Sequence, residues 1–290
     1  MIKMIKPVVN ASKIMDKYNT VILGLRGVVT DDKMIKPDVV DALINMKKQG
    51  MHVVMLSNTF ERVETVIRNL HDNKVPLAVF DTIITAGEVT HYLLQAKHND
   101  FAGLGNKYFC LGDASYCGVF DGLPQYQKVD ALPEADFIYV EKISATDGTV
   151  DSYVPILEHA VSLNMPLLCV GNDTSTYING EIALGTGALA EQYAVLGGKI
   201  ITVGKPDSKL FAYTIDGLSG IKKDKILVIG DSIPTDIKGA HLLGVDSMLV
   251  SKGIHVNTLG EGYIPDVAKT RELASNFDAS PDYVISNLRW

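Results

Sequence analysis

Short apolar runs alternate with amphipathic segments along most of the chain. The first run, residues 21–29, is apolar on both faces as far as Leu23 and is then broken by Gly24 and Gly27. Such a run is typical of a buried parallel strand that leads into a turn. Because open α/β sheets bind ligands at the carboxyl ends of their strands, we expect the functional site to lie just beyond this strand.

The alternation continues through the first third of the chain. Pro37 starts a helix that Gly50 ends, and residues 51–56 form a second buried strand that leads into Ser57 and Asn58. The elements expected next are a helix to about residue 71, a strand over 81–85 and a helix over 86–95.

A second α/β segment is predicted from about residue 97 to residue 198, where strands and helices alternate afresh. Its expected strands cover 108–111, 137–140 and 166–170, and its expected helices follow Asp113, cover 154–163 and include 185–190. Residues 199–203 are expected to return to the first domain. That domain then continues with a helix over 206–216, strands over 225–229 and 246–250, and a helix that ends at residue 243.

The predicted fold class is therefore α/β, with a doubly wound, mostly parallel sheet and an inserted second α/β domain. A chain of 290 residues, 47% of them hydrophobic, can bury two such cores. The predicted division is 1–88 for the first part of the core domain, 89–198 for the inserted domain and 199–290 for the rest of the core domain.

Composition and charge narrow the classes of partner. The net charge of −7 comes without a basic face, which argues against a nucleic-acid partner. No stretch approaches the roughly 20 apolar residues that span a bilayer, so no membrane partner is expected. Cys110, Cys117 and Cys169 lack the CxxC spacing of zinc sites, which suits a reducing compartment. We expect a cytoplasmic protein.

Polar residues follow several of the predicted strands. Asp231 and Asp236 come after the strand at 225–229 and suit Mg²⁺, although a helix cap and a surface aspartate would explain them nearly as well. Lys205 precedes a proline-started helix and could offset the charge of a phosphate, or could be a surface lysine. Ser57 and Asn58 beside a helix amino terminus suit phosphate oxygens, with an ordinary cap as the alternative.

Taken in order, these motifs resemble those of the haloacid dehalogenase superfamily, subclass IIA, the NagD-like hydrolases with an α/β cap of the C2 type. The matching segments are Ser57-Asn58 for the second motif, Gly204-Lys205-Pro206 for the third and Gly230-Asp231-Ser232-Ile233-Pro234-Thr235-Asp236 for the fourth. Residues 83–88 and 187–190 are similar to the entry and the last helix of the cap. The resemblance covers most of the chain.

The resemblance implies a Rossmann-like core, the α/β cap and a magnesium-dependent phosphatase that acts on a small phosphorylated metabolite. It places Ser57, Asn58 and Lys205 on the phosphate and places Asp231 and Asp236 at the metal. Asp173 falls on the aspartate of the substrate-facing cap loop, although the residues around it depart from the family pattern. Similar proteins often form homodimers through the cap.

The first motif departs from the family. There the first strand ends in Asp-x-Asp-Gly-Val, whose first aspartate attacks phosphorus and whose second acts as general acid and base. Here the register gives Gly24 and Arg26 at these two places. Glycine offers no nucleophile and arginine stays protonated, so the usual covalent route is closed. The metal also loses a carboxylate ligand, so Mg²⁺ binding is expected to be weakened.

Arg26 has two open interpretations. Its guanidinium could take part of the place of the ion by pairing with Asp231, Asp236 or a bound phosphate, or it could simply fill space. Asp31 and Asp32 follow in an expected flap loop. They are not expected to replace the nucleophile, because attack requires reacting atoms about 3–3.5 Å apart.

Three functions therefore stay open. The leading one is a catalytically impaired phosphatase homologue that still binds phosphate or a phosphorylated metabolite. The second is an active magnesium-dependent phosphatase, which needs a nucleophile that the sequence does not reveal. The third is a structural or interaction protein with a vestigial pocket and a homodimer through the cap.

Overall fold

The computed structural model describes residues 4–31, 34–112, 118–143, 149–178, 181–218 and 220–290. By its internal contacts the chain divides into two compact units. The core unit consists of Met1–Ser57, Glu64–Ile84 and Lys205–Trp290, and the cap unit consists of Asn58–Val63 and Thr85–Gly204. The second unit is thus inserted into the first, as the sequence predicts.

The core unit is built on a seven-stranded sheet with the order β1-β16-β15-β14-β2-β5-β6. The strands are β1 (Lys6–Pro7), β2 (Thr20–Leu23), β5 (His52–Ser57), β6 (Thr82–Thr85), β14 (Ile226–Gly230), β15 (Asp246–Val250) and β16 (Tyr283–Ile285). Along the sheet, every pair of neighbouring strands from β1 through β16, β15, β14 and β2 to β5 is parallel. The predicted first strand, β2, therefore lies between β14 and β5, and its carboxyl end shares an edge with theirs.

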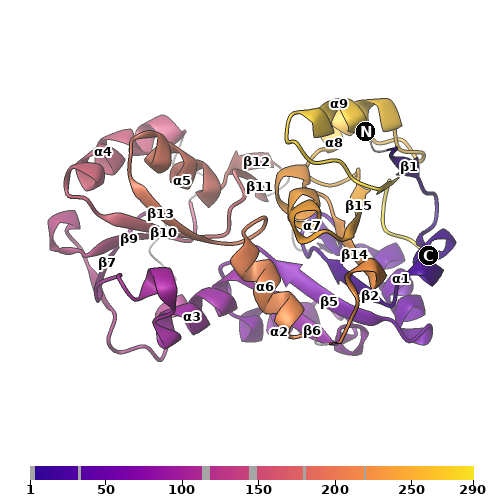
Figure 1. Cartoon of the computed structure of the whole chain (residues 1–290), viewed down its shortest axis with the longest axis horizontal. Helices are drawn as coiled ribbons and strands as arrows, with labels where there is room; N and C mark the ends of the chain where they lie inside the picture. The colour runs from indigo at the N-terminus through magenta and orange to yellow at the C-terminus, as the bar shows by residue number, and fades with distance from the viewer. Residues whose placement is uncertain (1–3, 32–33, 113–117, 144–148, 179–180, 219) are drawn as a thin grey trace. The chain divides into compact units, whose positions relative to one another are not determined.

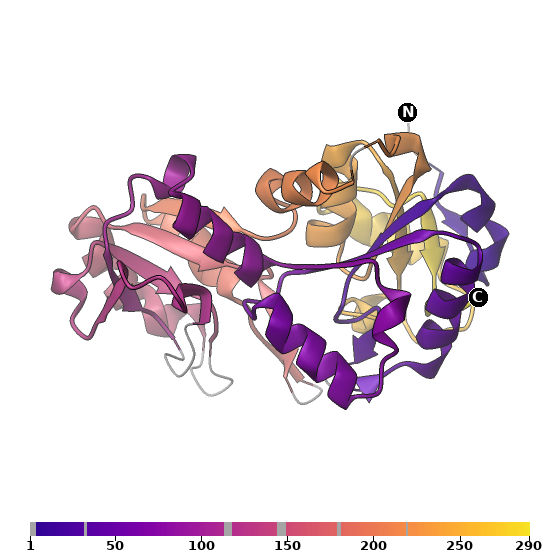
Figure 2. The same ribbon diagram turned by 90° about the horizontal axis from the view of Figure 1, so that it is seen from below.

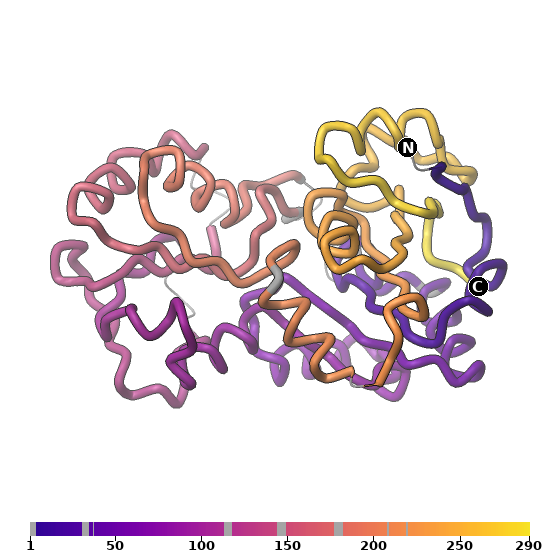
Figure 3. Tube along the Cα trace, in the orientation of Figure 1, coloured from indigo at the N-terminus to yellow at the C-terminus, as the bar shows by residue number. Residues whose placement is uncertain are grey.

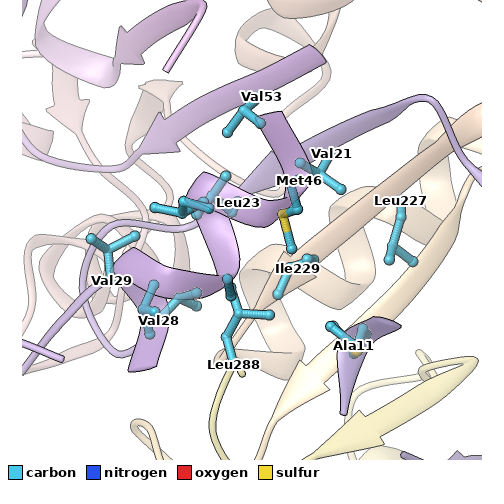
Figure 4. Packing of buried hydrophobic residues seen from close by; sticks show 14 of the residues in the cluster. Ala11, Val21, Leu23, Val28, Val29, Met46, Val53, Leu227, Ile229 and Leu288 are labelled. Atoms are coloured by element: carbon cyan, nitrogen blue, oxygen red, sulfur yellow. The ribbon is translucent and has the colours of Figure 1, made fainter. Parts of the chain in front are cut away.

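Helices pack on both faces of this sheet (Figure 1). They are α1 (Pro37–Lys48), α2 (Val63–Asp72), α6 (Ser208–Asp216), α7 (Lys238–Leu243), α8 (Val256–Leu259) and α9 (Val267–Ser275). Alternate residues of a strand point to opposite faces, so Val21 and Leu23 share one face of the sheet. Figure 4 shows this face, where Val53, Ile229 and Met46 of α1 pack around them.

The cap unit contains its own five-stranded sheet with the order β13-β10-β9-β7-β8, parallel throughout. Its strands are β7 (Lys107–Cys110), β8 (Gln127–Val129), β9 (Phe137–Val140), β10 (Pro166–Val170) and β13 (Lys199–Val203), and its helices are α3 (Ala86–Ala96), α4 (Val154–Ser162) and α5 (Thr186–Val195). Leu157 of α4 and Tyr193 of α5 pack with Ile138 and Val140 of β9 on one face.

The predicted return to the core at residue 199 needs correction. β13 pairs in parallel with β10 over its whole length, from Lys199 beside Pro166 to Val203 beside Val170. The strand is therefore an edge of the cap sheet, and the core resumes only at Lys205. An apolar run does not show which sheet it joins, because edge and central strands of either domain satisfy the same pattern.

Two antiparallel hairpins were not predicted as strands. One, β3 (Thr30–Asp31) with β4 (Met34–Ile35), occupies the expected flap loop, and the other is β11 (Ser175–Ile178) with β12 (Glu181–Leu184) in the cap. Asp32 lies outside the described residues, as do Cys117 and the start of the helix expected after Asp113.

The two ends of the chain are tied together within the core unit. β1 pairs with β16, and the Ala11 amide donates to the Arg289 carbonyl at 2.8 Å. Ala11 and Leu288 are buried in the same apolar cluster. Figures 2 and 3 show the indigo amino-terminal and yellow carboxyl-terminal segments in the same unit. Among the described residues, no helix is both long and apolar enough to cross a membrane.

Candidate functional site at the carboxyl edge of the core sheet

Lys205 and Asp236 form a buried ion pair at the carboxyl edge of the core sheet. Lys205 Nζ lies 2.7 Å from Asp236 Oδ1 and also donates to the Leu56 carbonyl at 3.2 Å. Both side chains are less than a tenth exposed. Leu56 belongs to β5, so the lysine joins the end of β5 to the loop that follows β14. The structure thus brings these two candidate residues into direct contact.

The turn after β14 holds the Asp236 side chain in place. Residues Ile233–Ile237 form a single π-helical turn that leads into α7. The Ser232 amide donates to Asp236 Oδ2 at 3.2 Å, within this turn. A Cβ on Gly230 would lie 2.1 Å from the Asp236 Cβ, so only glycine ends the strand without moving this aspartate.

Asp231 is enclosed by two glycine-containing loops. Its Oδ2 accepts a hydrogen bond from the Ile254 amide at 2.8 Å, in the loop after β15. A Cβ on Gly253 would lie 2.2 Å from the Asp231 Cβ, and a Cβ on Gly27 would lie 1.8 Å from Asp231 Oδ2. The carboxylate of Asp231 therefore fits between the loop after β2 and the loop after β15 only because both carry glycine.

Gly27→Ala is expected to destabilise the core unit by about 3 kcal/mol. Gly27 has a φ of +74°, which costs an alanine about 1–2 kcal/mol, and the added methyl would collide with Asp231. Gly50→Ala is the matched control, because Gly50 also has a φ of +74° but a Cβ there meets nothing within 4 Å. Urea unfolding of both variants measures the difference, and equal losses would contradict the close contact.

Gly24 directly follows β2 and has room for a side chain. Its amide donates to the Ile229 carbonyl at 2.9 Å, which continues the pairing of β2 with β14. A Cβ built on Gly24 would lie 3.6 Å from Val28 Cγ2 and 3.7 Å from Asp236 Oδ1, both ordinary contact distances. The position expected from the sequence to match the family's nucleophile therefore lies beside the buried ion pair, but it contributes no side chain.

Arg26 is exposed, and its backbone forms an isolated bridge with Thr30. Lys205 is a cation that contacts Asp236 directly. The pairing of Arg26 with an aspartate or a bound phosphate stays a prediction.

The remaining candidate residues are divided between the units. Ser57 is the last residue of β5 and is buried in the core unit, whereas Asn58 is half-buried and belongs to the cap unit. Asp173 also belongs to the cap unit, where its carbonyl accepts a hydrogen bond from the Gly187 amide at 3.0 Å. The group of residues in the core unit is therefore Gly24, Ser57, Lys205, Asp231 and Asp236.

Sequence reasoning missed the loop after β15. His255 Nε2 accepts a hydrogen bond from the Ile233 amide at 3.1 Å, at the start of the turn that carries Asp236. Burial lowers the pKa of His255 below its usual range, although the charge of Asp236 acts in the opposite direction. A neutral imidazole is the form that can accept this bond. In the sequence, Gly253 shortly after the predicted strand 246–250 could have indicated a tight loop at this edge of the sheet.

The residues present fit a magnesium ion in part. Asp231 and Asp236 would be its protein ligands, since Mg²⁺ commonly binds one or two carboxylates and completes its octahedron with water and phosphate. Over the described residues, no group of three or more His, Cys, Asp and Glu side chains is arranged to hold a metal. The Lys205 ammonium already occupies one side of Asp236.

Solved structures with this fold come from several bacteria. A haloacid dehalogenase-like hydrolase from Brucella suis is 24% identical, with a TM-score of 0.81 over 96% of this chain and 98% of that chain. A possible sugar phosphatase from Cytophaga hutchinsonii is 21% identical, with a TM-score of 0.73 over 98% of both chains. The glycerol phosphate phosphatase of Mycobacterium tuberculosis, in complex with magnesium, is 17% identical, with a TM-score of 0.62 over 87% of this chain and 71% of that chain. At these identities the likeness shows the fold.

Three family models match successive parts of the sequence. A haloacid dehalogenase-like hydrolase model matches residues 21–123, a second matches 116–244, and a HAD-hydrolase-like model matches 202–290. A search of curated proteins gave no significant match. Together the three family matches extend from β2 to the carboxyl terminus, so the chain belongs to the haloacid dehalogenase superfamily.

Proposed function

We propose that this protein binds phosphate or a small phosphorylated metabolite at the carboxyl edge of its core sheet and does not hydrolyse it through an aspartyl-phosphate. The observation that carries the proposal is Gly24, which leaves the site without a nucleophile beside an otherwise ordered group of charges. A Cβ at this position would lie 3.7 Å from Asp236 Oδ1, so a nucleophilic carboxylate at position 24 would stand beside Asp236.

Loss of the nucleophile removes the covalent step. In that step a carboxylate oxygen bonds to phosphorus, the bond from phosphorus to the leaving oxygen breaks, and an acid protonates the leaving group. Neither Gly24 nor Arg26 can perform its part, since glycine has no side chain and a guanidinium does not give up its proton.

Two side chains of the core unit are proposed to meet the phosphate. Lys205 places an ammonium among the strand ends, and Ser57 supplies a hydroxyl at the end of β5. A phosphate oxygen could draw the lysine away from Asp236, because a charge-assisted bond to phosphate replaces the one that is lost. Asn58 is a further proposed contact, by its place next to Ser57.

Magnesium binding is proposed to be weaker than in active relatives. Asp231 and Asp236 remain as carboxylate ligands, while Gly24 supplies none and Lys205 competes for Asp236. When bound, the ion would supply positive charge to the phosphate. The residues of this chain would hold and orient that phosphate through Lys205 and Ser57.

Calorimetric titration with inorganic phosphate, with and without Mg²⁺, tests the proposal. We expect binding by the natural protein, and we expect Lys205→Met to weaken it roughly tenfold or more, because a charged hydrogen bond is lost. Lys209→Met is the matched control, since Lys209 pairs with Asp207 at 3.4 Å on a more exposed surface. Ser57→Ala serves as a second variant if Lys205→Met does not fold.

Two other results would replace the proposal. Turnover of a phosphate ester by the natural protein, abolished by Asp231→Asn, would make it an active phosphatase with another nucleophile. No binding of phosphate or Mg²⁺, together with a stable dimer in solution, would favour an interaction protein that dimerises through its cap.

A further inference from the structure

The six residues Asn58–Val63 belong to the cap unit by their contacts. In the sequence, however, they follow β5 of the core and lead into α2. The Gly87 amide donates to the Thr59 carbonyl at 3.0 Å, and Thr85 Oγ1 donates to the Glu61 carbonyl at 2.7 Å. Two successive parts of the segment are thus fastened to the start of α3. We call these contacts the linker clasp.

A bidentate ion pair is also part of the linker clasp. Arg62 Nε donates to Glu88 Oε2 at 2.7 Å, and Arg62 Nη2 donates to Glu88 Oε1 at 2.9 Å. The same carboxylate accepts the Val63 amide at 3.1 Å, at the first residue of α2. Parallel hydrogen bonds between a guanidinium and a carboxylate fix the direction as well as the distance of the pair.

The Glu88 side chain is itself held in place. Its amide donates to Thr85 Oγ1 at 3.0 Å, which caps the start of α3. The hydrogen bond from Arg62, helped by the Val63 amide, lowers the pKa of Glu88, although burial acts against this. Glu88 is therefore ionised at neutral pH, and it keeps its charge to a lower pH than a free glutamate does.

Close backbone contacts complete the fastening. A Cβ on Gly87 would lie 1.9 Å from the Phe60 carbonyl oxygen, and a Cβ on Gly171 would lie 2.7 Å from the Asn58 carbonyl oxygen. A Cβ on Gly204 would likewise lie 3.2 Å from Asn58 Oδ1. The Asn58 end of the segment is therefore packed against the turns after β10 and β13 of the cap.

We propose that Arg62 and Glu88 are positioning residues, which make the segment Asn58–Val63 part of the cap and so fix the place of the Asn58 side chain. Ser57 and Asn58 are consecutive, yet the first belongs to the core sheet and the second is fastened to the cap. The consequence for phosphate binding rests on the proposed function above. The fastening itself does not depend on it.

Amide hydrogen exchange by NMR tests the fastening directly. In Arg62→Gln and Glu88→Gln we expect exchange at the Val63 and Gly87 amides to accelerate roughly tenfold, because a charge-assisted pair is lost. Arg62→Lys should fall between, since an ammonium lacks the guanidinium fork. Arg68→Gln is the matched control, because its pair with Glu64 at 3.8 Å lies on the exposed surface of α2.

Two further readouts separate positioning from general loosening. The side-chain amide signals of Asn58 should shift in Arg62→Gln and return toward their natural position in Arg62→Lys, while amides of α1 keep their exchange rates. Phosphate affinity should fall in parallel. Unchanged exchange and an unmoved Asn58 signal in Arg62→Gln would overturn the proposal.

The outcomes for the two proposals are distinct. If the natural protein binds no phosphate, the proposed function fails, while exchange and the Asn58 signal still decide the linker clasp. If phosphate binds and Arg62→Gln leaves both its affinity and the Asn58 signal unchanged, the positioning role is overturned and the phosphate site stands.

Discussion

The double variant Gly24→Asp, Arg26→Asp is expected to hydrolyse an aryl phosphate in the presence of Mg²⁺, roughly 10²-fold or more above the natural protein. The first substitution supplies the nucleophile and the second supplies the acid that protonates the leaving group. A Cβ at Gly24 meets its nearest neighbours at 3.6 and 3.7 Å, so the first atom of the new side chain makes only ordinary contacts. Arg26 is exposed, so an aspartate there would not be a buried charge.

Single variants separate the two contributions. Gly24→Asp alone should show weak turnover, and Gly24→Ala, which fills the same space without a carboxylate, should show none. Asp231→Asn in the double variant should abolish the gained activity. Activity in the natural protein would overturn the proposed function. An inactive double variant that still binds phosphate would mean that more than the first motif has been lost.

Lys205→Met is expected to lower the free energy of unfolding by about 3–5 kcal/mol. It leaves the Asp236 carboxylate, only 3% exposed, with the Ser232 amide but without its counter-charge. A buried charge that loses its partner retains the cost of desolvation. Urea unfolding at neutral pH measures the change.

Two further variants show whether burial causes this loss. Lys209→Met should cost less than about 1 kcal/mol, because its pair with Asp207 is longer and more exposed to solvent. The double variant Lys205→Met, Asp236→Asn should recover part of the stability, since the uncompensated charge is gone. Equal losses in Lys205→Met and Lys209→Met would contradict a desolvated pair.

Hydrophobic patterning predicted the helices and strands well, because the burial of each element determines which of its positions are apolar. The strands 137–140, 166–170 and 246–250 were predicted at the residues where they occur. Patterning does not determine which sheet a strand joins, and β13 was therefore assigned to the core although its ladder with β10 lies in the cap. Strands of two to four residues in hairpins were missed, since so few residues carry no recognisable period.

The sequence could predict those parts of the candidate site that consist of side chains. Lys205 and Asp236 follow apolar runs as charged residues, and the structure brings them into contact. The Leu56 carbonyl and the Ile254 amide could not be found in this way, because every residue carries the same backbone groups. The linker clasp depends on a contact between Arg62 and Glu88, 26 positions apart, for which one sequence offers no signal.

The glycines of the site make its tolerance to mutation uneven. At Gly27, Gly230 and Gly253 a single added carbon would lie 1.8, 2.1 and 2.2 Å from an aspartate atom, so almost any replacement there would disturb the carboxylates. At Gly24 the added carbon would make only ordinary contacts, with its nearest neighbour at 3.6 Å. Under the proposed function, the position that lacks its nucleophile is thus one at which an added carbon disturbs neither carboxylate. The proposed function then implies that a substitution at this position would change the chemistry of the chain without disturbing its scaffold.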